Sequence, residues 1–204
     1  MAIVPGSGST LADYIVPARP SRTSSIVRDG SLVVGASLLM ALSARVQIPL
    51  DPVPFTFQML VVMLTAAALG SWRATLAMLL YLAEGAGGLA VFAHPPYGGA
   101  LYFLTPTAGY LWSYPLAAFV VGWLCEQGLD RSFLTSVLAM LPGLVIIYGI
   151  GVPWLAIVLH IDLAQAFRIG MLLFIPGDLA KLVVASALLP VAWRVVRSIR
   201  SDLS

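Results

Sequence analysis

The chain has 204 residues, of which 60% are hydrophobic and 10% are charged, and its mean hydropathy is +0.96. Soluble domains carry about 25% charged residues, because charge keeps their surface hydrated. This composition excludes a water-soluble enzyme, and a net charge of +2 without a basic stripe excludes a nucleic-acid-binding protein. We therefore expect an all-α integral membrane protein embedded in the lipid bilayer.

The N-terminal segment differs from the rest of the chain. Residues 1–30 are rich in Ser, Pro, Gly and Arg and show no hydrophobic periodicity. We expect a flexible cytoplasmic tail here, followed by a transmembrane domain over residues 31–200. The apolar run after residue 30 begins too late, and is followed by too many others, to be a cleaved signal peptide.

Six apolar stretches are candidates for membrane spans. A helix rises about 1.5 Å per residue, so a crossing needs about 20 mostly apolar residues. The stretches lie at approximately residues 31–48, 55–70, 73–92, 106–125, 133–152 and 167–196. The second is short and the last is long. Residues 154–167 are interpreted as the end of the fifth helix and a short connection, which gives six transmembrane helices.

The basic residues predict the orientation of these helices, because Lys and Arg in short flanking segments remain cytoplasmic. An even number of spans places both termini on the same side. We expect both termini in the cytoplasm, since their side of the multi-pass protein holds Arg19, Arg22, Arg28, Arg73, Arg131, Arg194, Arg197 and Arg200.

Two loops on the predicted outer side contain helix breakers. Residues 47–56 have three prolines in six positions, and residues 92–99 combine a Pro pair with a Gly pair. Irregular backbone at membrane depth persists only where protein or a water-filled cavity satisfies its polar groups. The loops therefore indicate a binding site, although two ordinary surface turns remain an alternative.

Five ionisable residues lie in or next to the predicted spans, where each costs about 2.5 to 3.5 kcal/mol on insertion scales. All five fall on the outer half of the predicted topology, so a shared cavity open to the outside would house them. They are Arg45, Glu84, Arg168, Asp178 and Lys181.

Asp178 and Lys181 follow a Pro-Gly break and are three residues apart, so a helix places them on one face. In one interpretation Asp178 caps the new helix and pairs with Lys181 only for folding. In the other, the carboxylate accepts N–H donors of a ligand and the ammonium meets an anion. Both interpretations remain open. Two also remain open for Glu84, which either faces the cavity or pairs with Arg45.

Missing motifs narrow the function further. No Cys, His, Asp or Glu spacing suits a metal, and no metal site or cofactor is expected. Lys181 is the only lysine and no G-x-x-x-x-G-K-[ST] motif occurs, so the chain cannot form a Walker-type ATP site. Uphill transport would then need a partner or an ion gradient.

Four segments, in order, resemble the BioY family of biotin transporters. They are residues 47–49 with 53–58, residues 81–93, residues 105–111 and residues 176–181, and the resemblance runs from about residue 35 to 195. It implies a six-helix substrate-binding S component of an energy-coupling factor (ECF) transporter, which captures biotin from outside and is not an enzyme. A transmembrane T component and two ATPase subunits would supply the energy, and transport without them, as in some members of the family, is the alternative.

The resemblance also implies a biotin site that includes Asp178 and Lys181. Asp178 would accept the ureido N–H groups, and Lys181 would meet the ureido oxygen or the carboxylate, with Arg45 as the alternative anion partner. Neutral hydrogen bonds are expected from Gln58, Thr107 and Tyr110. Phe92, Tyr97 and Trp112 are candidates for apolar walls, with aromatic residues of the membrane-interface belt as the alternative, and Glu84 completes the candidate set.

The first span carries two small residues, Ser37 and Ala41, four positions apart. The family resemblance suggests that they meet the T component, and packing within this chain is the alternative. Two other functions also remain open. One is an S component for another vitamin, such as thiamine or riboflavin, and the other is an intramembrane enzyme or assembly factor.

Overall fold

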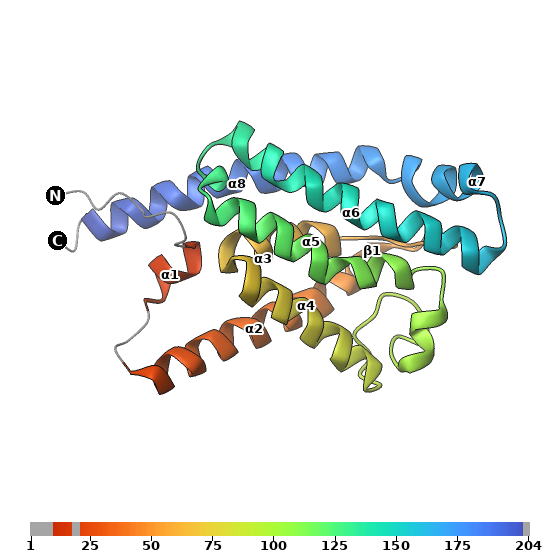
Figure 1. The fold of residues 1–204 in the computed structure, drawn as a ribbon, viewed down its shortest axis with the longest axis horizontal. Coiled ribbons are helices and arrows are strands. Elements are labelled where there is room, and N and C mark those ends of the chain that lie inside the picture. Colours follow the sequence, from red (N-terminus) through yellow and green to blue (C-terminus); the bar gives the residue numbers. More distant parts are fainter. Residues whose placement is uncertain (1–9, 18–20, 202–204) are drawn as a thin grey trace.

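The protein is a bundle of helices in a computed structural model that describes residues 10–17 and 21–201 (Figure 1). Part of the expected tail, including Arg19, lies outside the described residues. The elements are α1 (Leu11–Ile15), α2 (Arg22–Arg45), β1 (Gln47–Ile48), β2 (Phe55–Thr56), α3 (Gln58–Leu69), α4 (Ser71–Ala86), η1 (Ala100–Leu104), α5 (Ala108–Glu126), η2 (Leu129–Arg131), α6 (Phe133–Leu159), α7 (Leu163–Phe167), η3 (Arg168–Leu172) and α8 (Ile175–Ser201).

The start of the first long helix differs from the expected boundary at residue 30. Helix α2 begins at Arg22, because residues 22–30 contain no proline and continue the helix without a break. Upstream, Thr10 and Asp13 form a capping box that starts the short helix α1. The described part of the predicted tail is therefore largely helical.

Four helices of the described chain are long and apolar enough to cross a membrane: α2, α5, α6 and residues 175–198 of α8. Helix α3 is a shorter apolar helix, in line with the short second span. The four long helices overlap the first, fourth, fifth and sixth predicted spans. A multi-pass helical membrane protein is therefore confirmed, whereas the count of six crossings stays a prediction.

Helix α5 lies at the centre of the bundle and contacts α3, α4 and α6, while α2 packs on α4 and α8 packs on α6 and α3. Small residues occupy these contacts and let the helices approach closely. At Gly122, an added Cβ would lie 2.6 Å from the backbone of Gly70. The fully or almost fully buried alanines include Ala66, Ala67, Ala74, Ala77, Ala117 and Ala118.

The outward faces of the helices are apolar. Leu42, Leu76 and Val145 expose half or more of their side chains, as do many other leucines and valines. Such a surface would be unfavourable in water but contacts lipid tails without cost in a bilayer. The polar side chains are correspondingly drawn inside the bundle or to its ends.

The proline-rich segment after α2 folds into a two-stranded hairpin. Strands β1 and β2 are antiparallel, with Gln47 opposite Thr56 and Ile48 opposite Phe55. Prolines limit helix formation between them, so the chain turns back and enters α3. The hairpin thereby brings Phe55 and Thr56 to the side of α8.

The last predicted span is interrupted. Helix α6 ends at Leu159 and α7 follows, but residues 168–172 form a π-helical turn before α8 begins at Ile175. The hydroxyl of Tyr110 donates to the carbonyl of Gly170 within this turn, at 2.8 Å. A Cβ at Gly170 would lie 2.4 Å from that hydroxyl, so glycine permits the contact. The expected single helix 167–196 is therefore wrong at its start.

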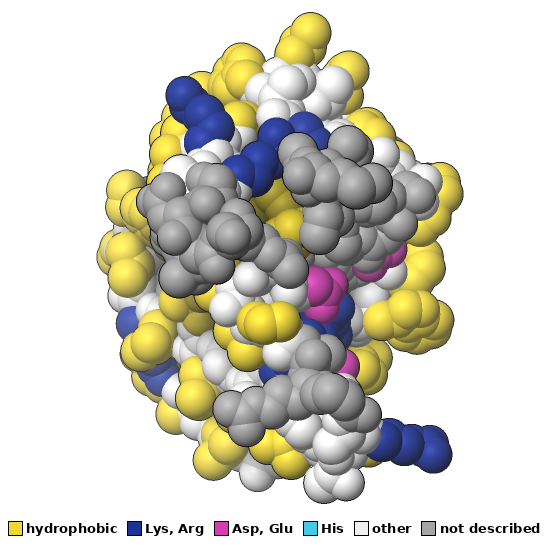
Figure 2. Space-filling view, turned by 90° about the vertical axis from the view of Figure 1, so that its left-hand side faces the viewer, with side chains coloured by type: hydrophobic (Ala, Val, Ile, Leu, Met, Phe, Trp, Pro, Cys, Tyr) yellow, Lys and Arg dark blue, Asp and Glu magenta, His cyan; other side chains and the backbone are white. Residues whose placement is uncertain are grey.

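Ionic side chains gather at the end of the bundle where α1 and the start of α2 lie, which we call the charged end (Figure 2). Asp13 accepts from Arg28 at 3.0 Å and from Arg73 at 2.8 Å. Burial raises the pKa of Asp13, but hydrogen bonds from Thr10 and Arg73 outweigh it and hold the pKa below its usual value. The pairs thus fasten α1 to α2 and α4.

A second contact at this end joins α8 to the connection between α5 and α6. Trp193 donates its indole N–H to Asp130 at 2.5 Å, and the Arg131 guanidinium lies 3.4 Å from the centre of the Trp193 ring. Burial raises the pKa of Asp130, although hydrogen bonds from Trp193 and Arg131 act in the opposite direction. The charged end is therefore held together by polar contacts between elements far apart in sequence.

Candidate functional site

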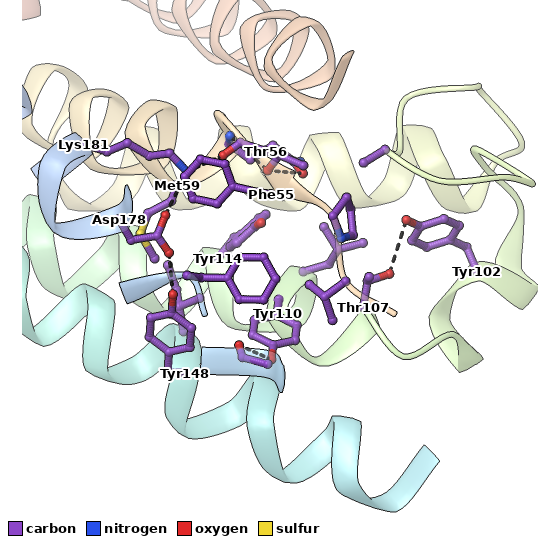
Figure 3. A pocket seen from close by; sticks show the side chains of 18 residues that line it. Phe55, Thr56, Met59, Tyr102, Thr107, Tyr110, Tyr114, Tyr148, Asp178 and Lys181 are labelled. Carbon is purple, nitrogen blue, oxygen red and sulfur yellow. Dashed lines mark hydrogen bonds and ion pairs between the residues drawn. The ribbon is translucent and has the colours of Figure 1, made fainter. Parts of the chain in front are cut away.

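A pocket opens between the hairpin, α3, α5, α6 and α8, and its polar groups lie at two ends with aromatic rings between them (Figure 3). It is lined by Val53, Pro54, Phe55, Thr56, Gln58, Met59, Ala93, Tyr102, Thr107, Tyr110, Leu111, Tyr114, Ile147, Tyr148, Gly170, Phe174, Asp178 and Lys181. Five of the predicted site residues are therefore brought together: Gln58, Thr107, Tyr110, Asp178 and Lys181.

Asp178 and Lys181 form a buried ion pair at one end of the pocket. The Lys181 ammonium donates to Asp178 Oδ1 at 2.8 Å. Lys181 is 8% exposed and Asp178 is 6% exposed. Helix α8 begins three residues before Asp178, so Asp178 sits in its first turn with its carboxylate directed to the pocket. The interpretation of Asp178 as a helix cap is wrong, because its side chain meets Lys181 and Tyr148 instead.

Tyr148 of α6 is the second donor to this carboxylate. Its hydroxyl donates to Asp178 Oδ2 at 2.5 Å, so each carboxylate oxygen receives one hydrogen bond from the protein. A carboxylate oxygen accepts more than one hydrogen bond. Asp178 is therefore held in a fixed orientation and retains capacity for a ligand donor.

The hairpin supplies further contacts to Lys181. The ammonium donates to the carbonyl of Thr56 at 2.6 Å and lies 3.5 Å from the centre of the Phe55 ring. Phe55 approaches α8 closely because residue 177 is glycine, where a Cβ would lie 2.3 Å from the ring. Gly177, in the first turn of α8, thus makes room for the aromatic ring beside the ion pair.

Aromatic rings form the middle of the pocket. Tyr110 and Tyr114 are one turn apart on α5, and both face the pocket. The Phe55 and Phe174 rings are stacked, with 6.1 Å between their centroids. The ring of Tyr110 is fixed by its bond to Gly170. Between its polar ends the pocket therefore suits an apolar group.

The opposite end is built from neutral hydroxyl groups. Thr107 donates to the hydroxyl of Tyr102 at 3.3 Å, and Thr105 lies 3.1 Å from Thr107. Gln58 lies on the hairpin side, where its amide donates to Tyr81 at 2.8 Å. These groups provide hydrogen bonds without adding charge.

Five predicted site residues do not line the pocket: Arg45, Glu84, Phe92, Tyr97 and Trp112. Arg45 is exposed, donates to the carbonyl of Ala90 and lies over the Tyr97 ring, because the loop after α4 folds back on the end of α2. Glu84 accepts from Ser37 at 3.1 Å, is not among the residues that line the pocket, and is not within ion-pair distance of Arg45. The shared cavity expected for five ionisable residues therefore holds two.

Phe92 lies behind the pocket wall rather than in it. The side chain is fully buried and its ring packs against Tyr81 and Tyr102. At Gly85 an added Cβ would lie 2.0 Å from this ring, so glycine makes room for it in α4. Phe92 fixes the position of Tyr102 and contacts no space that a ligand would fill.

Other predicted positions also differ. Arg168 is exposed, and the rings of Tyr97 and Trp112 lie outside the pocket lining. Ser37 is completely buried against Glu84 and Ala41 is half-buried, so Ser37 packs within this chain and does not face a partner helix.

Sequence reasoning missed several residues that complete the site. Tyr148 and Phe55 contact the ion pair, and Tyr102 closes the opposite end. A signal existed for Tyr148, since it is a polar aromatic residue within a long apolar stretch. The described residues hold no cluster of three His, Cys, Asp or Glu side chains that would bind a metal.

Comparison with known proteins identifies the family. The model of the BioY family matches residues 17–198. The chain belongs to the BioY family. It is 43% identical over 148 residues to a protein of Thermotoga maritima named biotin transporter BioY, covering 72% of this chain and 85% of that protein. It is 38% identical over 162 residues to the Rhizobium etli protein of the same name, covering 75% and 86%.

A solved structure agrees with this assignment. It is the S-component for biotin from an ECF-type ABC transporter, with a TM-score of 0.73 at 25% identity, covering 90% of this chain and 95% of that one. The BioY resemblance noted from four short segments is thus confirmed, together with the helical S-component fold. The residue-level site remains a prediction.

Proposed function

We propose that this BioY protein binds biotin and serves in its uptake as the S component of an ECF-type transporter. The observation that carries the proposal is the buried Asp178–Lys181 pair at the end of an aromatic pocket. Two opposite charges drawn into a membrane protein are costly unless they are used or well paired. The names of the BioY relatives and of the solved S-component point to the same ligand.

The donors and acceptors of the ion pair are complementary to those of a cyclic urea. One edge of the ureido ring presents an N–H beside the carbonyl oxygen, and the pair presents a carboxylate oxygen 2.8 Å from an ammonium. In our proposal Asp178 accepts the N–H and Lys181 donates to the ureido oxygen. Tyr148 keeps the carboxylate aligned for this contact.

The remaining lining suits the rest of biotin. Its thioether ring and alkyl chain are apolar and would lie against Tyr110, Tyr114 and Phe55. Gln58 and Thr107 are proposed as neutral hydrogen-bonding groups at the wall. Arg45, Glu84 and Phe92 are assigned to loop and helix packing instead.

We also propose the topology and the partners. The charged end faces the cytoplasm, since arginines concentrate there, and the pocket takes its ligand from the outer side of the cell membrane. Both termini, with the segment before α2, then lie in the cytoplasm. In this proposal a T component and ATPase subunits supply the energy, because the chain lacks a Walker motif.

Equilibrium binding to the purified full-length protein in detergent tests this function. Calorimetry with biotin, and with thiamine and riboflavin as controls, is expected to show saturable binding of biotin alone. Binding of a control vitamin in preference to biotin would indicate an S component for that vitamin. Folded protein that binds none of the three would contradict the proposal.

A further inference from the structure

The charge balance of the pocket leaves no cation for the carboxylate of biotin. Among the eighteen lining residues of the described chain, the charged side chains are Asp178 and Lys181. They compensate each other at 2.8 Å, so the pocket is neutral before a ligand enters. An anionic ligand group would have to find its contacts among neutral donors.

Lys181 cannot easily serve that group. Its ammonium has three N–H donors, of which two go to Asp178 Oδ1 and the Thr56 carbonyl, and the ureido oxygen takes the third in the proposed function. Reaching a second carboxylate would strip Asp178 of its counter-charge in a buried position. Lys181 therefore stays with Asp178 and the ureido end of the ligand.

The opposite end of the pocket offers hydroxyl groups. The hydroxyls of Tyr102 and Thr107 are within 3.3 Å of each other, and the Tyr102 oxygen also accepts from the backbone N–H of His94. Hydroxyl hydrogens rotate to suit an acceptor, so this group can turn an O–H toward a ligand oxygen. In Figure 3, Tyr114 lies between Tyr102 and the Asp178–Lys181 ion pair.

A ligand anchored at the ion pair thus directs its chain to the hydroxyl end. Resting on the proposed function, we propose that this protein recognises the distal group of biotin through a carbonyl oxygen bound by Tyr102 and Thr107, and not through its charge. A primary amide is similar in size to a carboxylate and also presents an acceptor oxygen, but it carries no charge. Biotin carboxamide is therefore a ligand of this pocket as well.

The test is competition binding on the purified full-length protein in detergent, with radiolabelled biotin displaced by biotin or by biotinamide. The expected result is an inhibition constant for the amide within tenfold of that for biotin. A ratio above tenfold shows that the pocket reads the negative charge and overturns the inference. No binding of biotin itself overturns the proposed function too, so the two failures are distinguishable.

Two variants sharpen the result. Tyr102→Phe keeps the ring packed on Phe92 and removes one hydroxyl, and it is expected to weaken biotin and biotinamide by a similar factor of about five to twenty, as loss of one hydrogen bond does. Arg45→Gln is expected to leave the ratio of the two affinities unchanged. Selective loss of biotin binding in Arg45→Gln would show that Arg45 pairs with the carboxylate, and would overturn the inference.

Discussion

The buried ion pair permits a prediction that separates folding from ligand binding. Lys181→Met removes the cation and leaves Asp178, 6% exposed, with the neutral Tyr148 hydroxyl as its remaining donor. Asp178→Asn leaves the Lys181 ammonium with the Thr56 carbonyl and the Phe55 ring. The double variant carries both substitutions and buries no net charge.

The expected magnitudes follow from the burial of both groups. Removing one partner of a buried pair costs about 3–5 kcal/mol, whereas replacing both by neutral groups of similar volume is often close to neutral. A loss of 1 kcal/mol lowers the melting temperature by about 2–4 °C in a chain of this size. Each single variant should therefore melt about 6–20 °C below wild type, and the double variant much closer to it.

Biotin binding should behave differently from stability. Both ligand contacts involve a charged partner, each worth about 1.5–3 kcal/mol, so each single variant should lose about 10- to 150-fold in affinity and the double variant at least about 100-fold. Thermal unfolding in detergent and calorimetric titration measure the two quantities. Our reasoning fails if the double variant is as unstable as either single variant, or if it binds biotin like wild type.

Three further predictions concern other contacts. Tyr148→Phe should fold normally but bind biotin about tenfold or more weakly in calorimetry, because Asp178 loses its second donor; unchanged affinity would show that the hydroxyl plays no part in binding. Gly85→Ala should lower the melting temperature, since its Cβ would lie 2.0 Å from the Phe92 ring, whereas Gly35→Ala, with nothing within 4 Å, should not. The lowered pKa of Asp13 means that its stabilisation is present above its ordinary pKa of 3.8 and lost as pH falls through the folded pKa. Asp13→Asn should therefore melt lower at neutral pH and lose less stability on acidification, and parallel pH profiles of the melting temperature would contradict this.

The sequence was sufficient for those features that depend on local composition and spacing. Sixty per cent hydrophobic residues require a lipid environment, and the prolines between residues 49 and 54 end a helix wherever the chain lies. Asp178 and Lys181 share a face because they are three apart on a helix. The four short segments also led to the BioY family, which the comparisons confirm.

The π-helical turn before α8 could not be predicted in this way. The apolar stretch over residues 167–196 was predicted to form one helix, yet the chain makes a π-helical turn at residues 168–172, where the Tyr110 hydroxyl, 60 residues away, donates to Gly170. The same holds for Arg45 and Glu84, which have the polarity of site residues. Packing directs Arg45 to the Ala90 carbonyl and Glu84 to Ser37.

The identity of this protein as a BioY family member, its helical composition and its central Asp–Lys pair are thus determined by the order of residues along the chain. The tertiary structure alone decided which side chains surround that pair. Tyr148 is 30 residues from Asp178, and Thr56 is 125 residues from Lys181. Their meeting depends on how α6 and the hairpin are rotated against α8, which results from the packing of many small and aromatic side chains and not from any local pattern.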